Sequence, residues 1–228
     1  MRSYTYEYPR PALTVDIVVF TLRDKKLQVL LIQRGAEPYR GSWALPGGFV
    51  HMAETLEAAA LRELEEETGV KDAYLEQLYT YGEPGRDPRG RVVSVAYFSL
   101  VPTSEDLQPR GGSDAAYAEW FPVDALPTLA FDHAEIISYA LRRLRYKLEY
   151  SAVGFELLPE TFTLTQIQST YETILGEKLD KRNFRRRILE ADIIEPTESL
   201  YSGEGRPARL YRYRADAVAE VKARRLFP

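Results

Sequence analysis

The sequence of 228 residues contains no cysteine and only two histidines. Without cysteine the chain can form neither disulfides nor thiolate metal sites, and a cysteine nucleophile is excluded. This suits a reducing compartment, so we expect a cytoplasmic location. Residues 1–11 lack the apolar core of a signal peptide. The best apolar stretch, Leu13 to Leu22, is interrupted by Asp16 and is too short to span a bilayer, so we expect no membrane partner.

The net charge of −4 is unevenly distributed along the chain. Five of the seven residues 181–187 are basic, whereas residues 1–150 are acidic overall. The net charge alone argues against nucleic-acid binding, but this local cluster leaves such binding open. Hydrophobic residues make up 45% and charged residues 28%, which are values of an ordinary globular protein with one large domain or a medium and a small one.

Residues 1–150 have the pattern of a mixed α/β domain. Two β-rich runs within 13–33 flank a polar turn at 23–26 and predict a hairpin. Gly69 is expected to end the helix predicted at 54–68. The other predicted elements are helices at 54–68 and 134–148 and strands at 91–100 and 118–122.

Residues 151–228 predict a second, smaller domain. Thr163 and Gln166 have the spacing of a capping box at the start of one helix, and Asp180 can cap another. Two short helices joined by a turn that contains glycine form a helix-turn-helix pattern. A turn or wing and a strand are predicted to follow, at 200–207 and 208–214.

Residues 48–70 match the pattern Gly-x5-Glu-x7-Arg-Glu-Leu-x-Glu-Glu-x-Gly-Val at every defined position. On a helix, Glu63, Glu66 and Glu67 fall within an arc of roughly 100°. Clustered carboxylates repel one another and favour a cation among them. Mg²⁺ is the natural occupant, because it prefers carboxylate oxygens and keeps phosphate or water as further partners. Most short acidic runs are solvated helix faces, but here the glycines and the arginine of the pattern are in place too.

Two neighbours of these glutamates have predicted supporting roles. Arg62 can orient a glutamate and offset repulsion, and Glu54 can brace Arg62. Gly48 lets the backbone approach a phosphate or the helix start.

This segment resembles the Nudix box, and the resemblance extends over about residues 10–150. It implies an α/β/α sandwich around a mixed sheet and an ADP-ribose-type ligand. It also implies that a metal-activated water attacks a diphosphate phosphorus. The cofactor is then Mg²⁺, with Mn²⁺ as the alternative. The implied metal ligands are Glu63, Glu66 and Glu67, and the implied catalytic residues are these three with Arg62.

Several residues outside the box are candidates for contacts with the ligand. Arg86 and Arg89 precede a strand, and guanidinium groups suit phosphate oxygens, although a solvated polar hairpin is the alternative. The similarity of this run to ADP-ribose-type Nudix domains favours the ligand role. Arg34 and Trp43 precede the box and can contact a nucleotide or ribose, or belong to the core. The predicted ligand-binding residues are Gly48, Arg34, Trp43, Arg86 and Arg89.

Three further polar residues are candidates for other roles. Asp114 and Glu119 are candidates for an extra metal ligand or a base. His133 is predicted to be a structural histidine rather than a catalytic one.

The second predicted helix of the smaller domain has an apolar side and a polar, basic side, as a DNA-recognition helix does. Phe184 and Ile188 form an apolar side, and the remaining positions present donors for phosphates and base edges. The alternative is a solvated basic helix in a dimerisation domain. The predicted DNA-binding residues are Lys181, Arg182, Asn183, Arg185, Arg186 and Arg187, with Arg206 and Arg209 from the wing region.

Taken together, the two parts resemble the Nudix-related transcriptional regulators of the NrtR type over nearly the whole chain. The resemblance implies a Nudix domain at 1–150, a winged helix-turn-helix domain at 151–228, and a homodimer that binds a double-stranded DNA operator. Such a repressor of genes for NAD metabolism or related functions senses ADP-ribose or a relative. Many of these regulators have a degenerate Nudix box, whereas this one is complete. The alternative is therefore an ADP-ribose pyrophosphatase that gives AMP and ribose 5-phosphate, with the C-terminal domain used for assembly only.

Overall fold

The computed structural model describes residues 5–71, 73–102, 115–202, 207–214 and 216–217. The chain divides into two compact units. The boundary falls between Ala140 and Leu141, inside helix α2 (His133–Leu148), and the second unit also includes Thr21–Gln28. This division lies earlier in the chain than the predicted boundary at residue 150, because α2 runs from one unit into the other.

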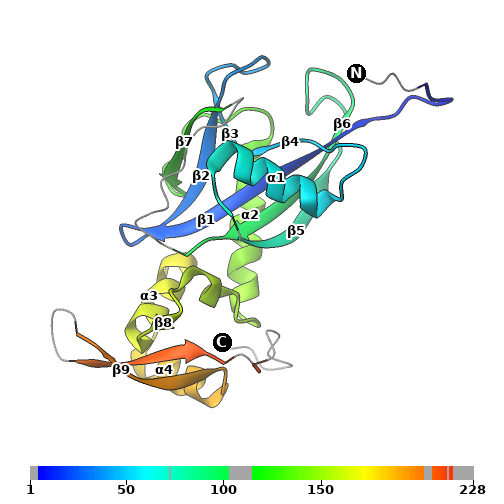
Figure 1. Cartoon of the computed structure of the whole chain (residues 1–228). Helices are drawn as coiled ribbons and strands as arrows, with labels where there is room; N and C mark the ends of the chain where they lie inside the picture. The colour runs from blue at the N-terminus through cyan, green and yellow to red at the C-terminus, as the bar shows by residue number, and fades with distance from the viewer. Residues whose placement is uncertain (1–4, 72, 103–114, 203–206, 215, 218–228) are drawn as a thin grey trace. The chain divides into compact units, whose positions relative to one another are not determined.

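A seven-stranded sheet forms the centre of the first unit in the described residues (Figure 1). The strand order is β3-β2-β1-β6-β5, while β4 pairs with β1 and β7 pairs with β2. The strands are β1 (Ala12–Arg23), β2 (Lys26–Arg34), β3 (Trp43–Ala44), β4 (Gly47–Phe49), β5 (Tyr74–Tyr81), β6 (Val92–Leu100) and β7 (Ala115–Pro122). The predicted hairpin and the strands near 91–100 and 118–122 are therefore present, whereas β5 has no counterpart in the prediction.

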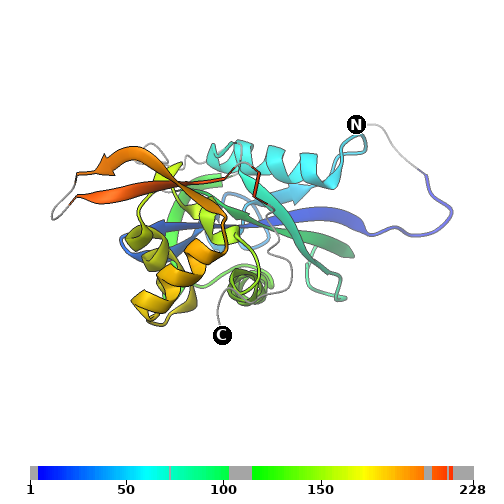
Figure 2. The ribbon, with the colours of Figure 1, turned by 90° about the horizontal axis from the view of Figure 1, so that it is seen from below.

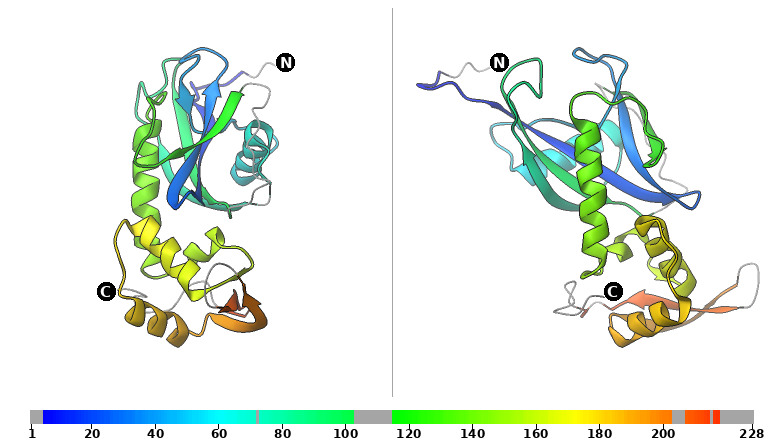
Figure 3. Two further views of the ribbon diagram at one scale, coloured as in Figure 1. Left: turned by 90° about the vertical axis from the view of Figure 1, so that its left-hand side faces the viewer. Right: turned by 180° about the vertical axis from the view of Figure 1, so that it is seen from behind.

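Helices α1 (Leu56–Thr68) and α2 lie on opposite faces of this sheet (Figure 3). Figure 2 views α2 nearly end-on, with α1 across the sheet from it. The expected α/β/α layering is thus confirmed. Because both faces of the sheet are covered, β1 and β2 are apolar and buried at nearly every central position rather than at alternate ones. No helix in the described part of the chain is long and apolar enough to cross a membrane.

Helix α1 begins at Leu56 because Thr55 is its N-cap, with the hydroxyl oxygen accepting a hydrogen bond from the Ala58 N–H at 3.1 Å. Gly69 ends the helix in the left-handed conformation, with φ 74°. Ala59, Ala60 and Leu64 are buried on the side of the helix that faces the sheet. The remaining side of α1 is left for polar residues.

The second unit contains helices α3 (Leu164–Leu175) and α4 (Lys181–Glu190) and a short 3-10 helix, η1 (Val153–Leu157). The predicted capping box of α3 is present, since Thr163 and Gln166 exchange both hydrogen bonds. Asp180 caps α4 by accepting a hydrogen bond from the Asn183 N–H at 2.8 Å. Two helices joined by a turn are therefore confirmed, and they are the helix-turn-helix.

A small sheet with the order β8-β10-β9 completes this unit. Its strands are β8 (Thr161–Phe162), β9 (Ile194–Tyr201) and β10 (Ala208–Tyr213), and β10 is antiparallel to both neighbours. β9 was missed in the sequence because it is mostly exposed and carries polar residues and Pro196, so it shows no alternation. Leu200 and Tyr201, the first residues of the predicted wing, therefore belong to β9, and residues 203–206 of that wing lie outside the described residues.

The core of the second unit is closely packed around Tyr171. Its ring meets that of Phe184 with centroids 5.6 Å apart, which joins α3 to α4. A Cβ atom at position 154 would lie 2.8 Å from the Tyr171 ring and 2.9 Å from Leu148, so only glycine fits there. Arg145 of α2 donates a hydrogen bond to the carbonyl of Ile174 at 2.8 Å and thereby holds the end of α3.

Candidate functional site

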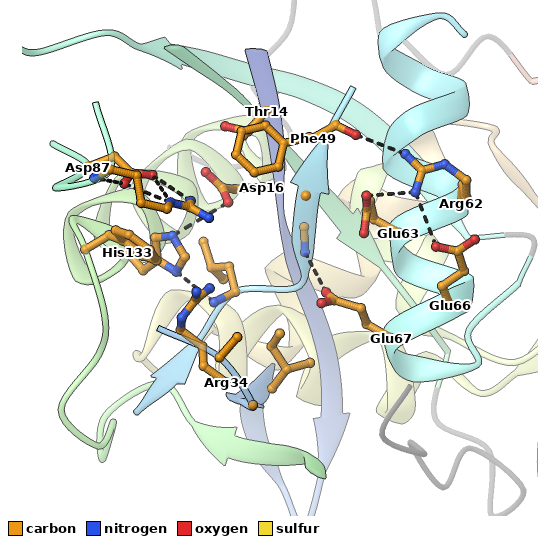
Figure 4. A pocket seen from close by; sticks show the side chains of 18 of the residues that line it. Thr14, Asp16, Arg34, Phe49, Arg62, Glu63, Glu66, Glu67, Asp87 and His133 are labelled. Atoms are coloured by element: carbon orange, nitrogen blue, oxygen red, sulfur yellow. Dashed lines mark hydrogen bonds and ion pairs between the residues drawn. The ribbon is translucent and has the colours of Figure 1, made fainter. Parts of the chain in front are cut away.

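A cavity of about 390 Å³ lies in the first unit, between α1 on one side and, on the other, Arg34 at the end of β2 and the loops that carry Asp87 and Phe131. In Figure 4, Arg62 and the glutamates project from α1 on one side, while Arg34, Asp87 and His133 lie on the other. Strands β1 and β4 run between these two walls. Of the predicted metal, catalytic and ligand-binding residues, all except Trp43 line this cavity.

Arg62 is the centre of the acidic wall. Its Nη1 donates hydrogen bonds to Glu63 at 2.7 Å and to Glu66 at 3.2 Å. Its Nε and Nη2 hold both carboxylate oxygens of Glu54, at 3.0 and 2.7 Å, so the structure contains the predicted brace. Nη2 also donates to the carbonyl of Phe49 in β4 at 3.2 Å. The hydrogen bond from Arg62 lowers the pKa of Glu54 to about 2, and the same bond raises the pKa of Arg62.

The three glutamates of the predicted metal site have different surroundings. Glu63 is half-buried, and burial raises its pKa despite the adjacent Arg62. Glu67 is buried and accepts a hydrogen bond from the Gly47 N–H at 2.8 Å. Glu66 is exposed over half of its side chain. In the conformations adopted here, no three acidic or histidine side chains of the described residues converge closely enough to hold a metal ion.

The residues nevertheless fit a divalent cation chemically. Glu63 and Glu66 share the positive charge of Arg62, and a divalent cation would offset their repulsion in the same way. A Cβ atom at position 48 would lie 2.3–2.7 Å from the Glu63 carboxylate, so glycine at this position leaves room for that carboxylate. Metal binding would require these side chains to turn toward one another, and their hard oxygen donors suit Mg²⁺.

Gly47 brings β4 against β1 beside this space. Its φ is 155°, and a Cβ atom there would lie 2.1 Å from the carbonyl oxygen of Val15. Any other residue would push the strands apart. The close approach of the two strands places the Gly47 N–H under Glu67.

On the opposite wall, Arg86 is held by a carboxylate. Its Nε and Nη2 donate to the two oxygens of Asp132, at 2.8 and 2.6 Å, and its side chain is only 5% exposed. Asp16 lies 3.6 Å away as a second carboxylate. These contacts join the 82–91 loop to the start of α2, so the geometry favours a structural role for Arg86 over the predicted phosphate contact.

Arg89 also has a carboxylate partner but remains at the cavity. Its Nε donates a hydrogen bond to Oδ1 of Asp87 at 3.0 Å, and its Nη2 donates one to Oδ2 at 2.6 Å. Although burial alone would raise it, the hydrogen bonds from Arg89 lower the pKa of Asp87. The guanidinium carbon of Arg89 lies 5.0 Å from the ring centroid of Phe49.

Arg34 forms no ion pair with any carboxylate that the structure describes. Its Nε donates to the carbonyl of Pro38 at 2.8 Å. Burial, followed by repulsion from Arg89, lowers the pKa of Arg34. An anionic ligand would relieve both effects, which makes Arg34 the best-placed predicted ligand contact on this wall.

His133 has the structural role expected of it. Its Nδ1 accepts a hydrogen bond from the Leu45 N–H at 2.8 Å, and its side chain is 4% exposed. Its Nε2 lies 3.6 Å from Asp16, which also accepts a hydrogen bond from Ser94. In the sequence Asp16 only interrupts an apolar run, yet a lone carboxylate in a buried strand is itself a signal of a polar site.

The structure does not bring the remaining candidates to the cavity. Trp43 packs edge-on against Phe121 with ring centroids 4.7 Å apart, as expected for a core residue. Glu119 is exposed on β7 and does not line the cavity, and Asp114 lies outside the described residues.

Helix α4 has one buried and one solvent-facing side. Phe184 and Ile188 are buried. Arg185 donates to the Thr165 hydroxyl at 3.0 Å, and Arg186 donates to Asn183 at 2.7 Å and to Glu190 at 3.3 Å. The exposed predicted DNA contacts are Lys181, Arg182, Asn183 and Arg186, with Arg209 on β10; Arg185 and Arg187 are partly buried, and Arg206 lies outside the described residues.

Comparison with known proteins finds a matching domain family for each of the two parts of the chain. Residues 12–143 match the NUDIX domain, and residues 154–213 match the NrtR DNA-binding winged helix domain. The ADPR responsive transcriptional repressor NtrR of Acinetobacter baylyi is 43% identical over 211 residues, which are 91% of this chain and 84% of that protein. The chain belongs to the NrtR family.

Solved structures of NrtR from Shewanella oneidensis resemble this chain closely. The complex with a 27mer DNA has a TM-score of 0.83 and 39% identity, and the match covers 94% of this chain and 99% of that one. The NUDIX domain of the same protein complexed with ADP ribose has a TM-score of 0.55 and 40% identity over 60% of this chain and 90% of that one.

The Nudix part of this NrtR-family chain is also similar to an enzyme. The ADP-ribose pyrophosphatase of Methanocaldococcus jannaschii is 42% identical over 135 residues, which are 59% of this chain and 76% of that protein. The similarity ends with the Nudix domain, so it bears on the cavity and not on the winged helix.

We predict that His133 makes the protein less stable in acid. Burial lowers its pKa below the usual 6.5, so its contribution to stability is complete above about pH 6.5 and is lost as the pH falls below that value. Melting temperatures measured from pH 7.5 to 5.5 should fall less steeply in His133→Asn. His51, the chain's other histidine, is exposed, and His51→Asn should keep the wild-type slope. Equal slopes in all three proteins would contradict the prediction.

We predict that Gly48→Ala weakens metal binding without unfolding the protein. The added Cβ would displace the flexible end of Glu63 rather than backbone, so the fold can adapt. Mn²⁺ titration followed by electron paramagnetic resonance should show about tenfold weaker binding. Gly82→Ala is the matched control, because a Cβ there would meet only ordinary contacts at 3.8 Å or more. Unchanged Mn²⁺ affinity in Gly48→Ala would speak against a metal beside Glu63.

Proposed function

We propose that this protein is a transcriptional repressor whose binding to operator DNA responds to ADP-ribose. The observation that carries the proposal is that one chain combines a cavity with facing acidic and basic walls and an NrtR winged helix with exposed basic residues on α4. The Acinetobacter relative, similar over most of both chains, is named for the same response. Genes of NAD metabolism or related functions are the proposed targets.

The proposal assigns the two walls of the cavity to different parts of the ligand. Arg34 and Arg89 supply positive charge for the diphosphate, and Gly48 allows close approach at the opposite side. Glu63, Glu66 and Glu67 would hold Mg²⁺, or Mn²⁺ as the alternative. Once bound, the metal would neutralise phosphate charge and lower the pKa of a coordinated water. Arg62 would keep the glutamates oriented and release them in part to the metal.

The proposal gives α4 the role of the recognition helix. Lys181 and Arg182 lie in its first turn and are exposed, which suits contacts with DNA phosphates. Asn183 and Arg186 carry the planar groups that bind base edges in pairs of hydrogen bonds. Arg185, Arg187, Arg206 and Arg209 are proposed as additional contacts. Because helix-turn-helix repressors occupy paired half-sites, we also propose that the protein acts as a homodimer, in the cytoplasm.

A second candidate function is hydrolysis of ADP-ribose to AMP and ribose 5-phosphate. The complete Nudix box favours it, as does the similarity to the Methanocaldococcus pyrophosphatase. The two functions are compatible, since a repressor that hydrolyses its ligand would limit its own response. They differ in what the winged helix does, because a pure enzyme would need it only for assembly.

We predict a gel shift with the DNA upstream of the protein's own gene, and a changed shift on addition of ADP-ribose. Lys181→Ala and Arg182→Ala should each reduce the slope of log affinity against log salt by about one, because each removes a phosphate contact. Lys71→Ala removes the same charge from the end of α1, where Lys71 pairs with Glu65, and should leave the slope unchanged. Absence of any shift would refute the repressor proposal.

We predict that any ADP-ribose hydrolysis requires Mg²⁺ and falls at least about a hundredfold in Glu66→Gln. Glu65→Gln is the matched control, since Glu65 is a neighbour on α1 that pairs with Lys71 and does not line the cavity. Release of AMP can be followed by chromatography. Rapid release together with no gel shift would favour the enzyme with an assembly domain, while a shift without release would favour a pure sensor.

A further inference from the structure

Two arginines of the basic wall share one aromatic ring. The guanidinium carbon of Arg34 lies 4.9 Å from the ring centroid of Phe131, and that of Arg89 lies 5.6 Å from the same centroid. Two like charges in such proximity repel, and this repulsion is one cause of the lowered pKa of Arg34. The electron-rich face of an aromatic ring attracts a guanidinium group and offsets part of that repulsion.

The hydrogen bonds of the two arginines leave some N–H groups of each guanidinium available to a ligand. Arg89 uses Nε and Nη2 for Asp87, and Arg34 uses Nε for the carbonyl of Pro38. Within the described residues, the Nη groups of Arg34 and Nη1 of Arg89 have no hydrogen-bond acceptor. Asp87 balances the charge of Arg89, but no described carboxylate pairs with Arg34. Within the described residues Arg34 therefore has no ion-pair partner at the cavity, and Glu67, Asp87 and Asp16 attract it only at longer range.

The backbone of Phe131 is held in an unfavourable conformation. Its φ is 52°, in the left-handed region that costs a non-glycine residue on the order of 1 kcal/mol. The hydrogen bond from the Ala130 N–H to the carbonyl of Trp43 at 2.8 Å fixes the segment just before it. The Phe131 ring also meets Tyr39 edge-on, with centroids 4.8 Å apart. A strained residue whose ring lines a binding cavity is a candidate for a functional position.

We propose that Phe131 is a positioning residue that holds Arg34 and Arg89 at one aromatic ring as a metal-independent site for a diphosphate. This inference deepens the proposed function and rests on it for the identity of the ligand. Arg34 lies across the cavity from Glu63, Glu66 and Glu67 (Figure 4), so a diphosphate can reach a metal on one wall and the arginine pair on the other. Pyrophosphate carries more negative charge than phosphate and offers more oxygens to the two guanidinium groups, so the pair favours diphosphates over monophosphates.

Three substitutions separate the ring of Phe131 from its backbone. Phe131→Tyr keeps the ring. Phe131→Asn removes the ring but suits the left-handed conformation, because asparagine adopts it more readily than other non-glycine residues. Phe131→Leu removes the ring and retains the strain. If Phe131 only packs, the pyrophosphate affinity should follow the stability of these variants. If it positions the arginines, the affinity should depend on whether the aromatic ring is present.

The test is calorimetric titration of the full chain with inorganic pyrophosphate, and with inorganic phosphate for comparison, in EDTA so that no metal contributes. We expect Phe131→Tyr to bind pyrophosphate like the wild type. We expect Phe131→Asn and Phe131→Leu to bind it about tenfold more weakly, as does Arg34→Gln. The preference for pyrophosphate over phosphate should shrink in the same variants. Phe131→Asn relieves the backbone strain but loses the packing of the ring against Ile32, Ala44 and Ala130, so its melting temperature should lie at or above that of Phe131→Leu.

Two outcomes would overturn the inference: wild-type pyrophosphate affinity in Phe131→Asn, or no pyrophosphate binding by the wild type in EDTA. Failure of the proposed function is distinguishable, because it appears as a gel shift that is absent or indifferent to ADP-ribose while the pyrophosphate results stand unchanged.

Discussion

The contacts of Arg62 solve the main electrostatic problem of the Nudix domain. Helix α1 and the loop before it place several carboxylates in a small volume, where they would repel one another or take up protons. One guanidinium group binds Glu54, Glu63 and Glu66 and also the backbone of β4. It thereby fixes the helix against the strand while leaving Glu63 and Glu66 facing the cavity. The acidic wall can persist without a metal and still exchange contacts with one.

The basic wall is built on a different principle, since two of its three arginines already have carboxylate partners. Asp132 holds Arg86 and Asp87 holds Arg89, so these pairs define the shape of the wall and add little net charge. The charge available to a ligand is concentrated at Arg34. A cavity of this kind selects by the spacing of a few positive groups rather than by a broad positive field, which suits a ligand with charge at its centre and neutral sugars at its ends.

The sequence was informative where a function depends on local spacing. The Nudix pattern places its glutamates on one helical face, and the capping signals of α3 and α4 act within a few residues, so both were predictable. Contacts between segments that lie far apart in the sequence were not predictable. Asp132 lies 46 residues from Arg86, and nothing near Arg86 indicates that its guanidinium is taken. Asp16 and Phe131 were missed for the same reason, since their roles depend on neighbours that only the fold supplies. Trp43 looked equally suited to ligand and core, and its contact with Phe121 favours the core.

The hydrogen bond between Arg186 and Asn183 on α4, at 2.7 Å, has a consequence for how an operator would be read. If Asn183 and Arg186 contact DNA as proposed, this hydrogen bond would couple the orientations of their side chains as they approach neighbouring base pairs. The preference at one base pair would then depend on the identity of the next. A description of the operator as independent positions would misjudge sites in which both base pairs change, and substitutions at these two residues would have non-additive effects on binding.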